Sequence, residues 1–502
     1  MPNKKILALT SITVFCSAIL AVASFAADAK PNVLFIVCDD LNTMIGCYGD
    51  AYAKTPNLDK LASRGMLFEK NYCQQPICNP SRASFMSGRR PDTLRIWDIP
   101  TNLRDRHPDL ITMPQWFKQH GYFAQGIGKI YHNFNQKIQG DPDSWSVPQL
   151  MHWDSHTTEK AFLPPGMPVP PNLAKDIQCE SRDVPDEAYF DGRIANLAKE
   201  ALQGFSKTGQ PFFLGVGMWK PHGPMNAPKK YWDMYRREEV PAPNPATRPK
   251  NAPDLAFHAN HEFLSYPPNY DPLREVDEEG KREMRHGYYA AISYVDAQIG
   301  KVIDELDRLS LAKNTIIVLT SDHGLQLGEH TSWGKMTLFE NDARSPLIIV
   351  APGVTPSGVK TRSISELIDI YPTLVDLCGL PQPAGLDGMS LKPVLADPTN
   401  SVKEAALTQH PRPAIYWRNS QYSKTRPMPT VMGYAMHNDR WCYTEWRDFK
   451  TGRVVGQELY DDQKDPTETV NLAGTLEGAT IIPALAEQLD TLIKSAKPMH
   501  DL

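Results

Sequence analysis

Three carboxylates, those of Asp39, Asp40 and Asp322, closely follow apolar runs of the chain. The first two come after the run 31–38, and the third comes after the run 314–320. Continuous apolar runs of this length are typical of strands buried on both faces of a parallel sheet, whose carboxyl ends share one edge. Clustered carboxylates repel one another unless a cation lies between them. Oxygen ligands suit Ca²⁺ or Mg²⁺, so the sequence predicts a divalent-metal site at this edge.

A further apolar run, 211–218, leads into Lys220-Pro221-His222 and predicts a third strand of the same kind. Three strand ends that deliver polar side chains to one edge are the physical reason to expect one active site. Taken one at a time, the polar residues at these strand ends do not indicate a function. A lone His222 after a proline, or a lone Lys129 after Gly128, is also typical of a solvated loop. Their order and their local context favour a shared site.

The run from Cys78 to Arg89 carries the most specific pattern. Cys78-Asn79-Pro80-Ser81-Arg82 has Pro at +2 and Arg at +4, and Gly88-Arg89 follows at +10 and +11. This run resembles the signature of type I sulfatases, C-x-P-S-R-x(4)-T-G-R, with Ser87 in place of the usual threonine. In that family the cysteine is oxidised by a maturation enzyme to Cα-formylglycine, whose hydrate is the nucleophile. The resemblance implies the same conversion of Cys78. An ordinary cysteine at a turn before a helix is the alternative.

Other stretches resemble the iduronate-2-sulfatase-like subgroup of this family. They are Asp39-Asp40, Gly128-Lys129-Ile130-Tyr131-His132, Lys220-Pro221-His222, Ser321-Asp322-His323-Gly324, Leu327-Gly328-Glu329-His330, Lys335, His410-Pro411-Arg412-Pro413 and Met432-Gly433-Tyr434. Many sulfatases have Asn where this chain has His323, which points to the subgroup. The subgroup usually has Tyr-Pro-Arg where this chain has His410-Pro411-Arg412, so the substrate contacts are open at this position.

The resemblance implies a Ca²⁺ site, with Mg²⁺ as the alternative. The implied ligands are Asp39, Asp40, the modified Cys78, Asp322 and His323. Histidine is an unusual ligand for calcium. The alternative for His323 is a position behind the ligands, where it would hold a carboxylate or a sulfate oxygen.

The resemblance also implies a role for each basic side chain. Arg82 anchors the formylglycine hydrate, Lys129 binds that residue or the sulfate, and Lys335 binds the sulfate. His222 protonates the departing sugar oxygen as one hydroxyl of the hydrate attacks sulfur. His132 then takes a proton from the second hydroxyl, which expels sulfate and regenerates the aldehyde.

Apolar residues at helical spacing predict helices over 188–205 and 288–309, between the predicted strands. Alternating strands and helices indicate an α/β fold with a mainly parallel sheet. The resemblance implies an alkaline-phosphatase-like sulfatase fold, with a large sheet flanked by helices. The stretch 235–275 is rich in Pro and Asn and predicts a long surface excursion.

The pattern changes after about residue 400. Short β-like runs at 430–436 and 441–446 are followed by a predicted helix over 482–495. We therefore expect a catalytic domain over 27–402 and a smaller C-terminal subdomain with an antiparallel sheet over 403–502.

Residues 1–26 predict a cleaved secretory signal. Two lysines precede an apolar run that ends in Ser24-Phe25-Ala26, which has small residues at the −3 and −1 positions. A retained membrane anchor is the alternative, since about 20 apolar residues can span a bilayer. Cleavage removes two lysines and no acids, so the formal charge changes from −5 to about −7. An exported acidic protein, periplasmic or secreted, is a poor candidate for nucleic-acid binding.

The function that these features predict is hydrolysis of a sulfate ester in a sulfated polysaccharide fragment. The resemblance points to the 2-O-sulfate of iduronate or a related hexuronate, with His330 and Arg412 as substrate contacts. Alternatives are a sulfatase for another sulfated sugar, of the galactan, carrageenan or ulvan type, and a phosphonate or phosphate monoester hydrolase of the same superfold. From a different class comes a non-catalytic protein that binds sulfated glycans.

Overall fold

The computed structural model describes residues 30–132, 140–152, 179–258, 277–414 and 428–496. The signal sequence predicted at 1–26 lies outside these residues. Within them, none of the helices combines the length and the apolar character that crossing a membrane requires.

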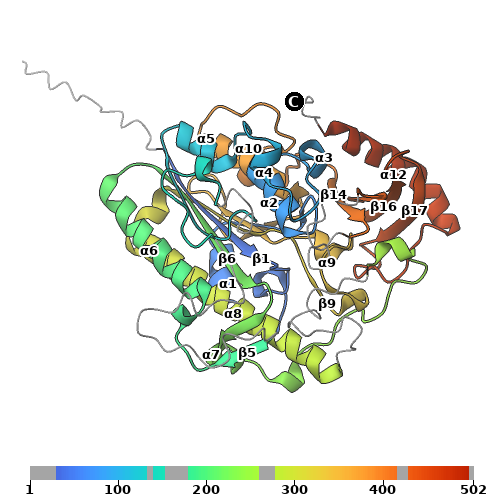
Figure 1. The fold of residues 1–502 in the computed structure, drawn as a ribbon, viewed down its shortest axis with the longest axis horizontal. Helices are drawn as coiled ribbons and strands as arrows, with labels where there is room; N and C mark the ends of the chain where they lie inside the picture. Colours follow the sequence, from blue (N-terminus) through green and yellow to red (C-terminus); the bar gives the residue numbers. More distant parts are fainter. Residues whose placement is uncertain (1–29, 133–139, 153–178, 259–276, 415–427, 497–502) are drawn as a thin grey trace, which may run out of the picture.

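A seven-stranded sheet forms the centre of the molecule, in the order β12-β2-β11-β8-β1-β6-β4 (Figure 1). The strands are β1 (Asn32–Asp39), β2 (Met66–Phe68), β4 (Phe123–Gly128), β6 (Phe212–Pro221), β8 (Thr315–Ser321), β11 (Leu347–Val350) and β12 (Val359–Thr361). β1 is parallel to both β6 and β8, and β4 is parallel to β6. β11 is antiparallel to its two neighbours. The three predicted strands and the mainly parallel sheet are therefore confirmed.

Helices cover both faces of this sheet because the side chains of β1 alternate between two apolar cores. Leu34 and Ile36 pack in one core with α6 (Phe190–Thr208), α8 (Glu278–Arg308) and α1 (Pro56–Ala62). Val33, Phe35 and Val37 pack in the other with α2 (Cys78–Ser87), α5 (Met113–Gln119) and α10 (Ile370–Leu377). All five side chains are fully buried, which stabilises the fold by roughly 1.5–3 kcal/mol each. This packing makes β1 a rigid support for the residues that follow it.

The two predicted helices exist, with different ends. α8 begins at Glu278, ten residues before its predicted start, and the Asp277 carboxylate accepts a hydrogen bond from the Gly280 amide at its N-terminus. The first turns of α8 are polar and largely exposed, so apolar spacing alone could not find them. Of the predicted excursion 235–275, the part up to residue 258 contains two 3-10 turns, at Arg237–Glu239 and Asp254–Ala256.

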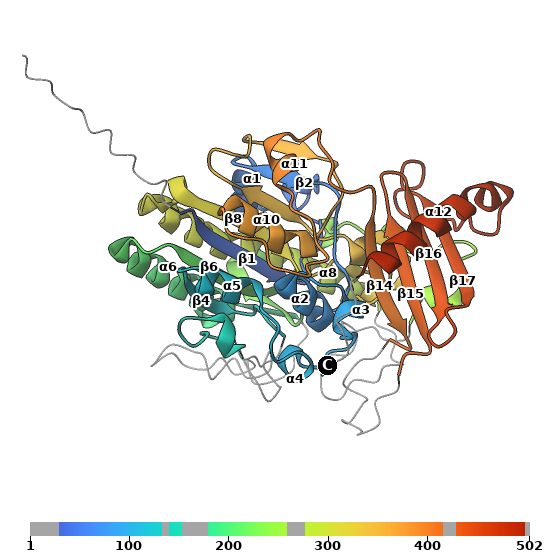
Figure 2. The same cartoon turned by 90° about the horizontal axis from the view of Figure 1, so that it is seen from above.

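The C-terminal part forms a four-stranded antiparallel sheet, as predicted. Its strands are β14 (Ala406–Arg412), β15 (Val431–His437), β16 (Trp441–Asp448) and β17 (Val454–Asp461), and α12 (Leu476–Ser495) packs against it. In Figure 2 this sheet lies beyond the carboxyl end of β1. The Gln409 amide of β14 donates to the carbonyl of Gln74, four residues before Cys78. The C-terminal sheet is thus in direct contact with the segment that leads to Cys78.

The remaining short elements connect these parts. They are β3 (Asn71–Tyr72), β5 (Cys179–Arg182), β7 (Met225–Pro228), β9 (Gln326–Leu327), β10 (Trp333–Gly334), β13 (Ser365–Glu366), α3 (Pro91–Leu94), α4 (Leu103–Arg106), α7 (Lys229–Trp232), α9 (Glu340–Ala343) and α11 (Lys392–Ala396).

Candidate active site

Five structural elements meet at the carboxyl edge of the large sheet. Asp39 is the last residue of β1, Asp322 follows β8, and Lys129 follows β4. His222 comes immediately after β6, and α2 begins at Cys78. The strand ends that the sequence predicted to converge do converge, and the N-terminus of α2 joins them.

Arg82 connects three of these elements from within α2. Its guanidinium is fully buried and donates to Asp322 Oδ2 at 2.9 Å and to Asp39 Oδ1 at 3.0 Å. It also donates to the backbone carbonyls of Lys129 and Ile130, at 2.6 and 3.1 Å. Removing one partner of such a buried pair costs roughly 3–5 kcal/mol, because a charge is left uncompensated. These contacts fix the shape of the site, and contact of Arg82 with a hydrate stays a prediction.

The Cys78 side chain lies at the centre of the cluster. Its Sγ atom is 3.3 Å from Lys335 Nζ and 3.5 Å from His323 Nε2. The Lys335 ammonium also donates to both carboxylate oxygens of Asp40, at 2.8 and 3.1 Å. The Cys78 sulfur therefore lies beside two basic side chains, one of which also binds Asp40.

The charges around Cys78 favour an anion at this position. Burial raises the pKa of the Cys78 thiol, but the ammonium groups of Lys129 and Lys335 and the side chains of His132 and His222 bring it well below its ordinary value. A place that stabilises a thiolate so strongly is suited to hold anionic oxygens. The four predicted basic residues thus act on the same atom.

The carboxylates beside Cys78 form a donor set that fits a divalent cation. Ligand atoms of Asp40, Cys78, Asp322 and His323 all lie within 4.8 Å of one another, and all four residues are buried. Burial raises the pKa of Asp322 to about 7 and also raises that of Asp40. The ionised forms of Asp40 and Asp322 are therefore not fully stabilised by the neighbouring cationic side chains. A hard cation would supply the missing positive charge, and carboxylate oxygen is the ligand it prefers.

Asp39 differs from the other two carboxylates. Burial opposes its ionisation, but the Lys129 ammonium, with which it forms an ion pair, and Arg82 hold its pKa below the usual range. It also belongs to a second group of ligand atoms within 4.8 Å, with Cys78 and His222. Asp39 is thus ionised and shared between the basic side chains and the candidate metal position.

The two predicted catalytic histidines occupy opposite electrostatic environments. Burial lowers the pKa of His222, but the Asp40 carboxylate, 3.6 Å from Nε2, raises it well above its ordinary value. Burial and the Lys129 ammonium lower the pKa of His132 to about 4. Two titratable groups whose pKa values are pushed apart in this way are suited to act as acid and base.

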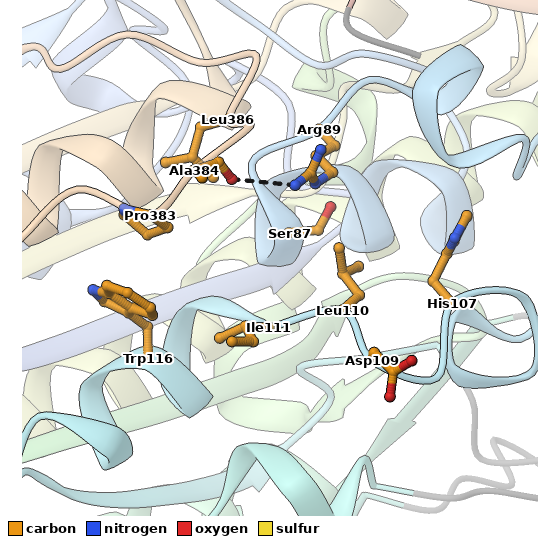
Figure 3. A pocket seen from close by; sticks show the side chains of 10 residues that line it. All are labelled: Ser87, Arg89, His107, Asp109, Leu110, Ile111, Trp116, Pro383, Ala384 and Leu386. Atoms are coloured by element: carbon orange, nitrogen blue, oxygen red, sulfur yellow. Dashed lines mark hydrogen bonds between the residues drawn. The ribbon is translucent and has the colours of Figure 1, made fainter. Parts of the chain in front are cut away.

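A separate cavity of about 390 Å³ opens at the other end of α2 (Figure 3). Ser87, Trp116 and Leu386 are among the side chains that line it, and Arg89 donates there to the carbonyl of Ala384. α2 has ten residues and is therefore roughly 15 Å long. The cavity-lining residue Ser87 is nine residues after Cys78, roughly 13.5 Å along the helix, so the cavity is separate from the candidate site.

Comparisons with known proteins identify the family. The sulfatase family model matches residues 31–380, and that of the N-sulphoglucosamine sulphohydrolase C-terminal region matches 328–495. The chain belongs to the sulfatase family. It is 32% identical to iduronate 2-sulfatase of Mus musculus, over 91% of this chain and 94% of that protein. It is 30% identical to choline-sulfatase of Rhizobium meliloti, over 90% and 85%.

The solved structures agree on the fold. A phosphonate monoester hydrolase from Silicibacter pomeroyi superposes with a TM-score of 0.74 at 23% identity, covering 93% of this chain and 96% of that one. The alkaline-phosphatase-like fold is therefore confirmed. The similarity to iduronate 2-sulfatase at 32% identity confirms the predicted subgroup. The protein is a sulfuric ester hydrolase.

In this sulfatase Arg412 lies outside the Cys78 cluster. Its guanidinium is 5% exposed and donates to the carbonyls of Leu255, Ala256 and Met336 at 2.8–3.3 Å. It also lies over the Trp446 ring, 4.5 Å from the centroid. Since Met336 follows Lys335, Arg412 fixes the loop that carries Lys335. A contact of Arg412 with the substrate stays a prediction.

His330 lies against the C-terminal part of the sulfatase. Its side chain is buried, Nε2 is 2.9 Å from the Thr467 carbonyl, and its ring is 4.3 Å from that of Phe339. These contacts account for its burial, and its predicted role towards the substrate is untested.

Sequence patterns did not indicate two residues that support the site. The Tyr288 hydroxyl donates to the carbonyl of Asp40 at 2.7 Å and accepts from the amide of Asn42 at 3.0 Å. The Asp191 carboxylate accepts from the amides of Trp219 and Lys220. Both lie in helices far from the motifs along the chain, and their types are ordinary there, so no local signal marks them.

Proposed function

We propose that this protein is an exported sulfatase that removes the 2-O-sulfate of iduronate or a related hexuronate from fragments of a sulfated polysaccharide. Similarity to iduronate 2-sulfatase over nearly the whole length of both chains supports this substrate class. The observation that carries the chemistry is the set of side chains around Cys78, in which Lys335 and His323 lie within 3.5 Å of the sulfur.

The proposal includes conversion of Cys78 to formylglycine by a maturation enzyme and a bound Ca²⁺. Asp40, Asp322 and His323, whose ligand atoms lie within 4.8 Å of one another and of Cys78, would hold the ion together with the modified Cys78. Asp39, which lies in a second such group with Cys78 and His222, would complete the ligands. When bound, such an ion neutralises charge on the sulfate oxygens and so lowers the cost of attack at sulfur. The formylglycine hydrate supplies the nucleophilic hydroxyl.

Each remaining step belongs to a side chain of this protein. Lys129 and Lys335 attract the anionic sulfate group and hold it beside residue 78. His222, kept protonated by Asp40 and Asp39, donates its proton to the departing sugar oxygen. His132, kept neutral by burial and Lys129, accepts a proton from residue 78 in the second half of the reaction.

Residues 1–26 fit this proposal as the signal that exports the protein to the periplasm or the medium. Long sulfated polysaccharides cannot enter a cell unaided, so an exported enzyme meets them or their fragments first. N-terminal sequencing of the mature protein should begin after Ala26.

A panel of defined substrates tests the proposed function. The purified enzyme, with formylglycine content measured by peptide mass spectrometry, is assayed for released sulfate. Substrates are a hexuronate 2-sulfate disaccharide, a 6-sulfated neutral sugar, choline sulfate and an aryl sulfate, with a phosphonate monoester assayed for its alcohol. We expect the uronate 2-sulfate to have the highest kcat/KM and Cys78→Ala to be inactive on all. Preference for the neutral sugar or choline sulfate rejects the substrate. Preference for the phosphonate rejects sulfate-ester specificity.

A further inference from the structure

The pairing of β6 with its neighbours becomes irregular just before His222. Pairing with β1 is regular up to Val37 and Gly217, and then Asp39 pairs with Pro221. Between these two pairs β1 advances by two residues, whereas β6 advances by four. Pairing with β4 also stops at Gly217. Trp219 and Lys220 lie in this irregular stretch, where the regular ladder to both neighbouring strands is interrupted.

β4 and β6 come into very close contact where this irregular stretch begins. A Cβ atom on Gly217 would lie 2.1 Å from the Lys129 carbonyl oxygen, and one on Gly128 would lie 2.0 Å from the Gly217 carbonyl oxygen. Gly128 also has a φ of 79°, which favours glycine. The backbones of β4 and β6 thus touch at this point. The amides of Trp219 and Lys220, between Gly217 and Pro221, have their partners outside the sheet.

Asp191, the second residue of α6, supplies these partners. Its carboxylate is fully buried, Oδ1 accepts from the Trp219 amide at 2.7 Å, and Oδ2 accepts from the Lys220 amide at 3.0 Å. Each oxygen thus satisfies one amide of the irregular stretch. A carboxylate in the first turn of a helix is also stabilised by the helix dipole. Asp191 therefore replaces the missing strand partner of β6.

Both residues held by Asp191 contact groups of the candidate active site. The Trp219 ring lies under the Lys129 ammonium, 5.0 Å from Nζ to the centroid. The Lys220 ammonium donates to the His222 carbonyl at 3.2 Å and to the Pro224 carbonyl at 2.7 Å. The His222 amide in turn donates to the Asp39 carbonyl at 3.1 Å. One carboxylate thereby fixes the strand end from which His222 projects.

We infer that Asp191 is a positioning residue that sets the place of His222, and with it the protonation of the leaving group. The inference rests on the proposed acid role of His222. A sugar alkoxide is a poor leaving group and needs a proton, whereas 4-nitrophenolate departs with little help. Loss of the acid position should therefore slow sugar sulfates far more than 4-nitrophenyl sulfate. Loss of general structure would slow both alike.

Asp191→Asn is the test variant, because asparagine has the same size but places an NH₂ group against one of the two amide donors. Asp296→Asn is the matched control. Asp296 is also buried, accepts from the amides of Leu58 and Asn57, and burial raises its pKa to about 6, as it does for Asp191. It lies in α8 and holds the start of α1, away from Cys78. Its substitution should leave kcat unchanged for both substrates.

We expect Asp191→Asn to lower kcat for the sugar sulfate about 10- to 100-fold, and kcat for 4-nitrophenyl sulfate less than about 3-fold. Rates are normalised to formylglycine content, and the sugar sulfate is the best substrate of the panel above. Equal losses on the two substrates, or no loss on either, would overturn the inference. If Asp191→Asn does not fold, Lys220→Met releases the His222 carbonyl and should show the same selectivity, and equal losses there overturn it too.

His222→Ala separates this inference from the proposed function. A loss confined mainly to the sugar sulfate confirms the acid role of His222, and Asp191→Asn must then show a smaller loss of the same kind. If His222→Ala slows both substrates equally, the acid role itself is rejected. If His222→Ala is selective and Asp191→Asn is not, the acid role stands and the positioning role of Asp191 is rejected.

Discussion

A buried group of carboxyls between the two sheets should make this protein less stable as pH rises. Glu340, at the start of α9, donates its amide to Glu468 Oε2 at 2.9 Å, and its carboxylate lies 3.4 Å from His437 Nδ1. One carboxyl oxygen of Asp462 and one of Glu468 are buried without a hydrogen-bond partner. Burial and the neighbouring carboxylate of Glu340 raise the pKa of Asp462 to about 8, and burial with Asp462 raises that of Glu468 well above its usual range.

The sign and size of the effect follow from linkage. The unfolded Asp462 has a pKa of about 3.9, so between that value and about 8 the folded protein holds a proton that the unfolded chain releases. Stability is therefore greatest below the unfolded pKa and falls as pH rises towards the folded pKa. A shift of about four units corresponds to at most roughly 5 kcal/mol. Asp462 is partly exposed and its charge also acts on the nearby Glu468, so about 1–3 kcal/mol is expected.

Thermal unfolding of Asp462→Asn at pH 5 and pH 8 measures this cost. The amide cannot ionise, so the variant should gain several degrees over the wild type at pH 8 and little at pH 5. Asp304→Asn, which removes an exposed ion pair with Lys60 at 3.2 Å, is the control and should change Tm slightly and equally at both pH values. A gain of equal size at pH 5 and pH 8, or a loss at pH 8, would refute the reasoning.

Three further outcomes are expected. In the active enzyme the peptide containing Cys78 should be about 18 Da lighter than its thiol form, because oxidation replaces CH₂SH by CHO. An active preparation in which mass spectrometry finds only the thiol form would contradict the formylglycine mechanism. Asp322→Asn should lower kcat at least about 100-fold while weak substrate binding is retained. Chelation should abolish activity until Ca²⁺ is added back. Full activity of demetallated protein would exclude the proposed metal site. Arg412→Ala should raise KM for a uronate 2-sulfate more than for an aryl sulfate without a carboxylate, because only the uronate offers a carboxylate to the guanidinium. Equal effects on the two substrates would assign Arg412 to structural contacts, such as its hydrogen bonds to backbone carbonyls.

The strand ends of the site were predictable from sequence because a strand buried on both faces is a local property. Runs such as 33–38 are apolar at every position, and the sheet places their last residues on one edge. The polar residues that follow could therefore be expected together although Asp39 and Asp322 are 283 positions apart. The resemblance to sulfatases added Cys78 and the basic residues, which no periodicity indicates.

The supports of the site were not predictable, because they depend on contacts between distant segments. Asp191 matters because the pairing of β1 with β6 shifts register next to it, just after Gly128 and Gly217 bring β4 and β6 into close contact. Arg412 is predicted to face a substrate. The described contacts of its guanidinium are with backbone carbonyls, among them those of Met336 and Leu255, with His410 Nδ1 and with the Trp446 ring. A basic residue in a motif thus indicates proximity to the site, and only packing shows which partner it has.

The charge balance of the site explains why metal removal should be decisive. The carboxylates of Asp39, Asp40 and Asp322 are matched by three cations, Arg82, Lys129 and Lys335, each of which contacts at least one of them. These six buried charges sum to zero, so any net attraction for a sulfate ester comes from the histidines beside them. Although burial lowers the pKa of both His222 and His323, Asp40 raises the pKa of His222 well above its ordinary value, and the Asp322 carboxylate raises that of His323 to about 9. Both histidines therefore depend on ionised carboxylates for their positive charge. A divalent ion would give the cluster a net charge of the sign that an anionic ester requires, and would free Lys335 from Asp40 to face the sulfate.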